Sequence, residues 1–211
     1  MKRVPLRVDD RSRVYTVCRF VVLALLGSLY RLTVSGAQHI PASGPVLVAV
    51  SHKSDLDPLF AGAGLRRQMR FMAKVELFRV PLLGRLIKAL GAFPVERGAG
   101  DRAALEISLQ VLANGEALLM FPEGTRHKDA EIHPFMPGVG MIAMRSGATV
   151  IPAALTGTNR IVHNGRPGLP VVHLIIGPPV DLSGFEGRKS VVYAQAAERM
   201  RVAVRGLYER S

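Results

Sequence analysis

Two stretches decide the fold of this chain: HKSDLD at His52–Asp57 and FPEGTR at Phe121–Arg126. Each follows an apolar run that is typical of a buried strand, Val46–Val50 before the first and Ala117–Phe121 before the second. In open α/β sheets, ligands and catalytic groups collect in the loops beyond the carboxyl ends of the strands. We therefore predict an α/β fold in which these two loops contribute to one site.

The residue types in the two loops indicate the chemistry of that site. The first loop brings the imidazole of His52, with carboxylates close by in the sequence. The second brings Glu123 and Arg126 beside Gly124, a residue at which the backbone can approach a ligand closely. A base, a group that orients it and a bidentate clamp for an anion are what acyl transfer to a phosphorylated alcohol requires.

Four motifs, taken in order, resemble those of the glycerolipid acyltransferase family. The first, His-x4-Asp, falls on His52 and Asp57, and the others fall on Phe93–Arg97, Phe121–Arg126 and Val150–Ala154. The first and third motifs are the specific ones. The resemblance extends over roughly residues 46–155.

The resemblance implies a fold and an activity. The expected fold is α/β and single-domain, of the glycerolphosphate-acyltransferase type, with a central, mostly parallel or mixed sheet flanked by helices. The expected reaction moves a fatty acyl group from acyl-CoA or acyl-carrier protein to the free hydroxyl of 1-acyl-sn-glycerol-3-phosphate, giving phosphatidic acid in phospholipid biosynthesis. No cofactor is expected. The alternatives are another acceptor, such as glycerol-3-phosphate or another lysolipid, and a catalytically silent basic domain that binds membranes or nucleic acid.

The roles of individual residues follow partly from chemistry and partly from the resemblance. His52 is the candidate general base, because imidazole has an unperturbed pKa near 6.5 and accepts a proton near neutrality. Only the resemblance selects Asp57 over Asp55 as the carboxylate that orients it. The resemblance also implies a set of substrate-binding residues: Lys74, Arg97, Glu123, Gly124, Thr125 and Arg126. Of these, Arg97 and Arg126 suit the acceptor phosphate, whereas Glu123 either contacts the acceptor hydroxyl or holds Arg126.

The sequence offers no nucleophile of its own for an acyl-enzyme. No G-x-S-x-G motif is present, and Cys18 lies in an apolar segment where a thiolate is disfavoured. We therefore expect direct transfer between the two substrates. A ligand-like cluster follows the third motif, at His127, Asp129, Glu131 and His133. Because its spacing matches no structural zinc pattern, we interpret it as a polar loop and expect no metal site.

Composition favours an anionic partner. The chain has 211 residues, 48% of them hydrophobic, and a formal net charge of +12. Such a charge suits a membrane surface, anionic substrates or nucleic acid. Because aromatic residues make up 6% and tryptophan is absent, stacking platforms for nucleic acid are poorly supplied. We therefore expect an anionic membrane surface and its lipids as partners, and no nucleic acid.

The amino-terminal segment indicates how the membrane is reached. Phe20–Tyr30 is an apolar run of eleven residues between Arg19 and Arg31, about 16 Å long as a helix and too short to span a bilayer. We predict a helix in the membrane interface within a segment 1–38, followed by an acyltransferase domain at 39–211 and peripheral attachment to the cytoplasmic face. Its cations would face the lipid headgroups: Lys2, Arg3, Arg7, Arg11, Arg13 and Arg19. A core helix and a cleaved signal peptide are the alternatives.

Other segments complete the predicted α/β pattern. Phe78–Leu90 forms an apolar stripe that suits either the core or a wall of the acyl-chain entrance. A helix is predicted from Asp101 to Ala113 and a closing helix over Ser190–Leu207. The expected strands lie at Ala117–Phe121, Thr149–Leu155 and Val171–Ile176.

Overall fold

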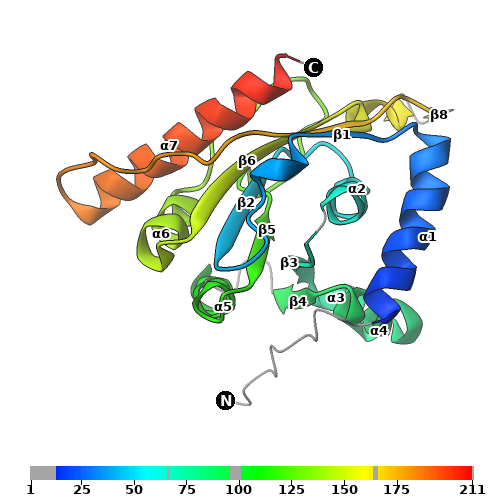
Figure 1. Cartoon of the computed structure of the whole chain (residues 1–211), viewed down its shortest axis with the longest axis horizontal. Helices are drawn as coiled ribbons and strands as arrows, with labels where there is room; N and C mark the ends of the chain where they lie inside the picture. The colour runs from blue at the N-terminus through cyan, green and yellow to red at the C-terminus, as the bar shows by residue number, and fades with distance from the viewer. Residues whose placement is uncertain (1–12, 66, 96–100, 164–165, 211) are drawn as a thin grey trace.

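A seven-stranded mixed sheet lies between two layers of helices (Figure 1). The computed structural model describes residues 13–65, 67–95, 101–163 and 166–210. Its α-helices are α1 Arg13–Leu29, α2 Asp57–Gly64, α3 Val75–Arg79, α4 Pro81–Ala89, α5 Asp101–Ala113, α6 Pro137–Ser146 and α7 Lys189–Tyr208. Its strands are β1 Thr33–Ser35, β2 Val46–Val50, β3 Met69–Lys74, β4 Ala92–Val95, β5 Ala117–Met120, β6 Thr149–Thr156, β7 Val162–His163, β8 Arg166–Pro167 and β9 His173–Ile176.

The strand order of the large sheet is β1-β9-β6-β2-β5-β3-β4, while β7 and β8 form a separate hairpin. From β6 to β4 all neighbouring strands are parallel, whereas β9 pairs antiparallel with β6 and parallel with β1. The carboxyl ends of β2, β5 and β3 therefore meet at one edge of the sheet. The two loops that the sequence singled out both begin there.

Two apolar cores account for the burial of the central strands. On one face, α1 and α2 cover the sheet, and on the other α5, α6 and α7 cover it (Figure 1). All five residues of β2 are fully buried, because a parallel strand covered on both faces has no solvent side. The predicted α/β fold with a mixed, helix-flanked sheet is confirmed.

Most predicted elements have nearly the predicted bounds. The helix Asp101–Ala113 is observed as α5, and the closing helix extends one residue further at each end. The stripe Phe78–Leu90 is not one helix, because the chain becomes extended at Val80 and α4 begins at Pro81, whose fixed φ suits a first helical turn.

Helix α1 has an inner and an outer side. The inner side packs on α2 through Leu26 and carries Arg19, whose Nε donates to the carbonyl of Leu65 at 3.3 Å. The prediction that Arg19 faces lipid headgroups is therefore wrong. The reason is that Leu65 is the C-cap of α2, where helix carbonyls need a donor. The other predicted headgroup contacts lie outside the described residues: Lys2, Arg3, Arg7, Arg11 and the side chain of Arg13.

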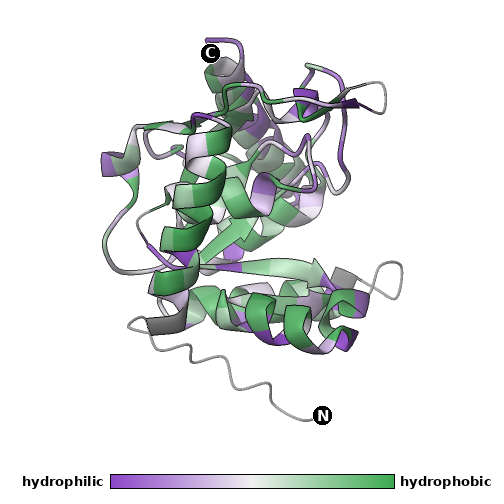
Figure 2. Ribbon diagram, turned by 90° about the vertical axis from the view of Figure 1, so that its right-hand side faces the viewer, coloured by the Kyte–Doolittle hydropathy of each residue, from purple (hydrophilic) through white to green (hydrophobic). Residues whose placement is uncertain are grey.

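The outer side of α1 is apolar and exposed. Figure 2 is seen from the side of α1 and shows this helix mostly in the hydrophobic colour. Its exposed large apolar side chains are Val17, Phe20, Val21, Leu25 and Leu29. Within the described residues, no helix is long and apolar enough to cross a membrane. After α1 the chain enters the large sheet as β1, and the division of the chain at residue 38 stays a prediction.

Candidate active site

His52 and Asp57 form a hydrogen-bonded pair just beyond β2. The distance between His52 Nδ1 and Asp57 Oδ2 is 2.9 Å. Asp57 is fully buried in the first turn of α2, while the His52 side chain keeps 15% exposure. Because an ionised carboxylate only accepts, the proton lies on Nδ1 and the lone pair on Nε2. Nε2 has no hydrogen-bond partner among the described residues, so it is free to take a proton from a substrate.

The carboxylate of Asp57 also shapes the loop that carries His52. Its Oδ2 accepts the backbone N–H groups of Lys53 at 2.5 Å and Ser54 at 2.7 Å. The loop thus folds around this oxygen, and the same atom fixes the imidazole tautomer. Asp55 is 82% exposed at its side chain and turns away to Arg126. The sequence spacing did not decide which carboxylate contacts His52. The structure shows that Asp57 does and that Asp55 contacts Arg126.

The imidazole of His52 is held from two further directions. Its ring stacks on Phe121, with centroids 4.2 Å apart and an interplanar angle of 24°. Its backbone N–H donates to Glu123 Oε1 at 2.9 Å, and its carbonyl accepts the N–H of His127 at 3.1 Å. The loop after β5 therefore contacts the loop after β2 through both side-chain and backbone groups.

Glu123 is the buried bridge between the two loops. Besides the N–H of His52, its carboxylate accepts the N–H of His133 at 3.2 Å and lies 3.5 Å from Lys53 Nζ. Neither Glu123 nor Lys53 exposes any of its side chain. Of the two roles left open for Glu123, holding Arg126 is not what the contacts show, because the carboxylate binds the loop of His52. Contact with the acceptor hydroxyl stays a prediction.

Sequence reasoning missed Lys53, the residue between His52 and Ser54. Its ammonium is buried among Glu123, the carbonyl of Glu131 and Asp129 Oδ1, the last at 3.7 Å. A buried charge needs such partners, since desolvation otherwise disfavours it. The sequence gives little signal for this role, because the partner carboxylates lie far along the chain.

Arg126 occupies the open part of the site. It forms an ion pair with Asp55, and 35% of its side chain is exposed. A guanidinium with one exposed carboxylate partner can exchange that partner for a phosphate, which it binds bidentately. Arg126 and His52 thus come from loops that contact each other, as a site for a phosphorylated alcohol requires.

The turn between Glu123 and Arg126 depends on Gly124. Its φ is +73°, a conformation that favours glycine, and a Cβ there would lie 2.5 Å from Met136 Sδ. The N–H of Gly124 donates to the carbonyl of Phe121 at 3.1 Å. The turn therefore already uses this N–H. Thr125 is exposed beside Arg126.

Lys74 and Arg97 are the two remaining cations that the motifs predict for the site. Lys74 is exposed at the carboxyl end of β3, on the same edge of the sheet as the loops of His52 and Arg126. Arg97 lies outside the described residues.

Helix α7 brings Tyr208 beneath the buried part of the site. Its pKa is raised, first by burial and then by the negative charges of Asp57 and Glu123. Its ring centroid lies 5.8 Å from Lys53 Nζ. The carboxyl-terminal helix therefore lies against the buried part of the site.

A small apolar groove lies between α1, α2 and β3. Its lining starts at Pro58, the residue after Asp57, and includes Leu59, Met69, Phe71 and Leu90. One wall comes from α1, through Val22. Pro58 thus connects the lining of the groove to Asp57 along the chain.

The part of the chain that carries these loops matches a known class of transferase. The acyltransferase family model matches residues 31–156 of the chain, which is more than half of its length. The chain therefore belongs to the acyltransferase family, and the resemblance seen in its motifs is confirmed.

Particular relatives narrow the class. The 1-acyl-sn-glycerol-3-phosphate acyltransferase of Bacillus subtilis is 31% identical over 166 residues, which are 78% of this chain and 80% of that protein. A chloroplastic one of Arabidopsis thaliana is 30% identical over 177 residues, 81% of this chain and 49% of that protein. The chain thus spans about half the length of its plant relatives. The crystal structure of the 1-acyl-sn-glycerophosphate acyltransferase PlsC of Thermotoga maritima matches with a TM-score of 0.74 and 27% identity, covering 96% of this chain and 84% of that one.

Proposed function

We propose that this protein transfers a fatty acyl group from a thioester to the free hydroxyl of 1-acyl-sn-glycerol-3-phosphate, giving phosphatidic acid in phospholipid biosynthesis. The thioester is that of acyl-CoA or acyl-carrier protein. The observation that carries the proposal is the 2.9 Å contact between His52 Nδ1 and Asp57 Oδ2, in a loop that contacts the loop of Arg126. The names of the similar proteins support the choice of acceptor.

The reaction proceeds by direct transfer. His52 Nε2 takes the proton of the acceptor hydroxyl while the hydroxyl oxygen attacks the thioester carbonyl. The tetrahedral intermediate then collapses, the C–S bond breaks, and the imidazolium returns the proton to the leaving thiolate. Asp57 keeps the tautomer and stabilises the imidazolium, as the carboxylate of a serine-hydrolase triad does. An ester and a free thiol are the products, and no cofactor takes part.

Arg126 binds the acceptor phosphate in this proposal. Phosphate replaces Asp55 on the guanidinium and places the acceptor hydroxyl near His52. Lys74 and Arg97 are assigned to the same anionic substrates on the strength of the motifs, and Thr125 and the Gly124 turn support the Arg126 loop. Glu123 acts by positioning His52.

We place the protein peripherally on the cytoplasmic face of a membrane. The outer side of α1 and the neighbouring α3–α4 segment would enter the lipid, since both expose large apolar side chains. Those of the second segment are Leu77, Val80, Leu82, Leu83 and Leu86. The groove beside α2 then receives the acyl chain directly from the lipid side. Attachment of this kind gains from anionic lipid, because the chain carries a formal charge of +12.

An acceptor panel tests the proposal. The purified full chain is incubated with acyl-CoA or acyl-carrier protein thioester, and thiol release is followed with lysophosphatidate, glycerol-3-phosphate, lysophosphatidylcholine or monoacylglycerol in anionic vesicles. We expect the highest kcat/KM with lysophosphatidate. Preference for glycerol-3-phosphate or another lysolipid would replace the acceptor and keep the chemistry. If no acceptor gives thiol release, the proposal is wrong and the alternative of a catalytically silent membrane-binding domain is favoured.

A further inference from the structure

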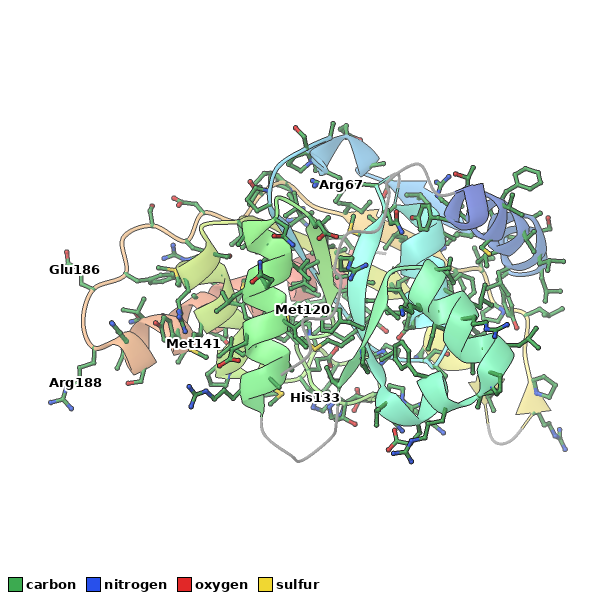
Figure 3. All side chains as sticks on the ribbon, turned by 90° about the horizontal axis from the view of Figure 1, so that it is seen from below. Arg67, Met120, His133, Met141, Glu186 and Arg188 are labelled. Carbon is green, nitrogen blue, oxygen red and sulfur yellow. The ribbon has the colours of Figure 1, made fainter. Side chains whose placement is uncertain are left out.

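A compact group of side chains lies just beyond Arg126 and takes no part in the proposed reaction. His127, Asp129 and His133 each offer one ligand atom, and these atoms lie within 4.8 Å of one another. His133 is labelled in Figure 3, at the edge of the molecule opposite to Arg67. We propose that these three residues bind a divalent first-row transition metal ion, with zinc as the representative. The proposal is independent of the proposed function.

The geometry of the group suits a shared ion. His133 Nε2 lies 2.8 Å from Asp129 Oδ2, and the rings of His127 and His133 are stacked with centroids 3.6 Å apart and 14° between planes. Two ligand atoms on tetrahedral zinc, each about 2.0–2.2 Å from the metal, are roughly 3.4 Å apart. Small side-chain movements therefore bring the three atoms to one ion, and water completes its coordination.

The loop that carries the ligands is already held in place. The N–H of His127 donates to His52 at 3.1 Å, and that of His133 to Glu123 at 3.2 Å. Within the loop, Asp129 Oδ1 accepts the N–H of Glu131 at 3.2 Å, whereas Oδ2 contacts His133 Nε2, a contact that the ion would replace. Ordering the ligands consequently costs less than it would in a free loop.

The local charge also favours a cation, although the chain is basic. Lys53 lies 3.7 Å from Asp129 Oδ1, but its charge is compensated by Glu123 at 3.5 Å. The group of three therefore keeps one negative charge, that of Asp129. Two imidazoles and one carboxylate form a donor set that prefers zinc, nickel, cobalt or copper over magnesium and calcium. The neighbouring Lys128 is exposed, so solvent screens its charge.

Spacing alone could not indicate this site, because the sequence shows four polar residues in a loop and no zinc pattern. The fold selects three of them and stacks the two imidazoles. Since the N–H of His127 reaches the carbonyl of His52, an ion held here would brace the loop that carries Arg126.

Metal binding to the untagged full chain tests the inference. The protein is treated with chelator, exchanged into buffer and titrated with zinc against a chromophoric competitor, and then with cobalt to record its visible absorption. We expect saturable binding of one ion per chain. His133→Gln and Asp129→Asn should each weaken it by more than about tenfold, since removing even an outer-shell partner of a ligand costs 10–100-fold. His173→Gln changes a histidine of β9 that pairs with Thr33, and this variant should bind like the wild type.

A second readout needs no variant. In histidine NMR spectra of the wild-type chain, zinc should shift the ring resonances of His127 and His133 and leave those of His39 and His173 in place. Absence of saturable binding would overturn the inference, and so would equal weakening by His173→Gln. Equal shifts at all four histidines would point to unspecific association and would also overturn it.

Discussion

The buried and the open halves of the site are built in opposite ways. Glu123 and Arg126 are three residues apart in one loop, yet the Glu123 side chain is fully buried and contacts three donors. Arg126 is one-third exposed and has one exposed carboxylate partner, Asp55. A group whose contacts are all satisfied within the protein holds its neighbours, whereas a group with a replaceable partner can bind a ligand. The third motif therefore combines a residue that builds the site with one that we propose binds substrate.

The largest effect on the rate should come from the buried half, at Asp57. Asp57→Asn places an amide donor toward the backbone N–H groups of Lys53 and Ser54 and releases the tautomer of His52. We expect kcat to fall by roughly 10²–10⁴-fold, the range for positioned acid–base catalysis. Steady-state kinetics with lysophosphatidate would measure it. Asp55→Asn is the matched control, and an equal loss in both variants would remove the distinction between the two carboxylates.

Glu123→Gln should affect stability before it affects binding. The change leaves the buried Lys53 ammonium without its nearest carboxylate and turns an amide toward backbone donors. Removing one partner of a buried ion pair costs about 3–5 kcal/mol, so the free energy of unfolding in urea should fall by that amount. Glu106→Gln breaks an exposed pair with Arg102 and should change it by no more than about 0.5 kcal/mol. Similar losses in the two variants would contradict the bridging role of Glu123.

Arg126→Ala should act on the acceptor and leave the fold unchanged. We expect kcat/KM for lysophosphatidate to fall. The fall should correspond to a loss of about 1.5–3 kcal/mol of transition-state stabilisation, the range for a hydrogen bond to a charged group. The penalty should shrink with monoacylglycerol, which lacks the phosphate. Asp55→Asn frees the guanidinium. It should lower the acceptor KM by at most about fivefold, which corresponds to roughly 1 kcal/mol, because exposed ion pairs contribute little. Equal penalties of Arg126→Ala for both acceptors would return Arg126 to a structural role.

The smallest effects should come from the outer side of α1. Phe20→Ser and Leu25→Ser should each weaken binding to anionic vesicles by on the order of 1 kcal/mol, less than the 1.5–3 kcal/mol of full burial. Vesicle flotation at low and high salt would measure this. Val202→Ser on α7 replaces an exposed apolar residue of another helix and should have no effect. If all three variants bind alike, α1 does not enter the lipid.

The sequence predicts the parts of the site that depend on local pattern. The helix Asp101–Ala113 is predicted to within one residue, because Asp101 can cap it and Asn114-Gly115 stops it. The motif loops are predicted because each follows an apolar strand. The choice between Asp55 and Asp57 could not be made from spacing, since the intervening loop is not helical and its shape depends on Asp57 itself.

Contacts between distant segments explain what sequence reasoning missed. Lys53 is 70 residues from Glu123, and nothing local marks it as a buried charge. Arg19 looked like a headgroup contact because it stands among other cations, yet the end of α2 supplies a carbonyl that it reaches. The positions of both side chains depend on partners that only the tertiary fold brings close.

Turnover of purified His52→Ala tests the central claim, that His52 is the general base of a direct transfer, most directly. The variant is compared with the wild type for thiol release from acyl-CoA in the presence of lysophosphatidate, after circular dichroism has verified its fold. The account predicts that release with acceptor drops by roughly 10²–10⁴-fold. Wild-type turnover in a folded His52→Ala variant would contradict it.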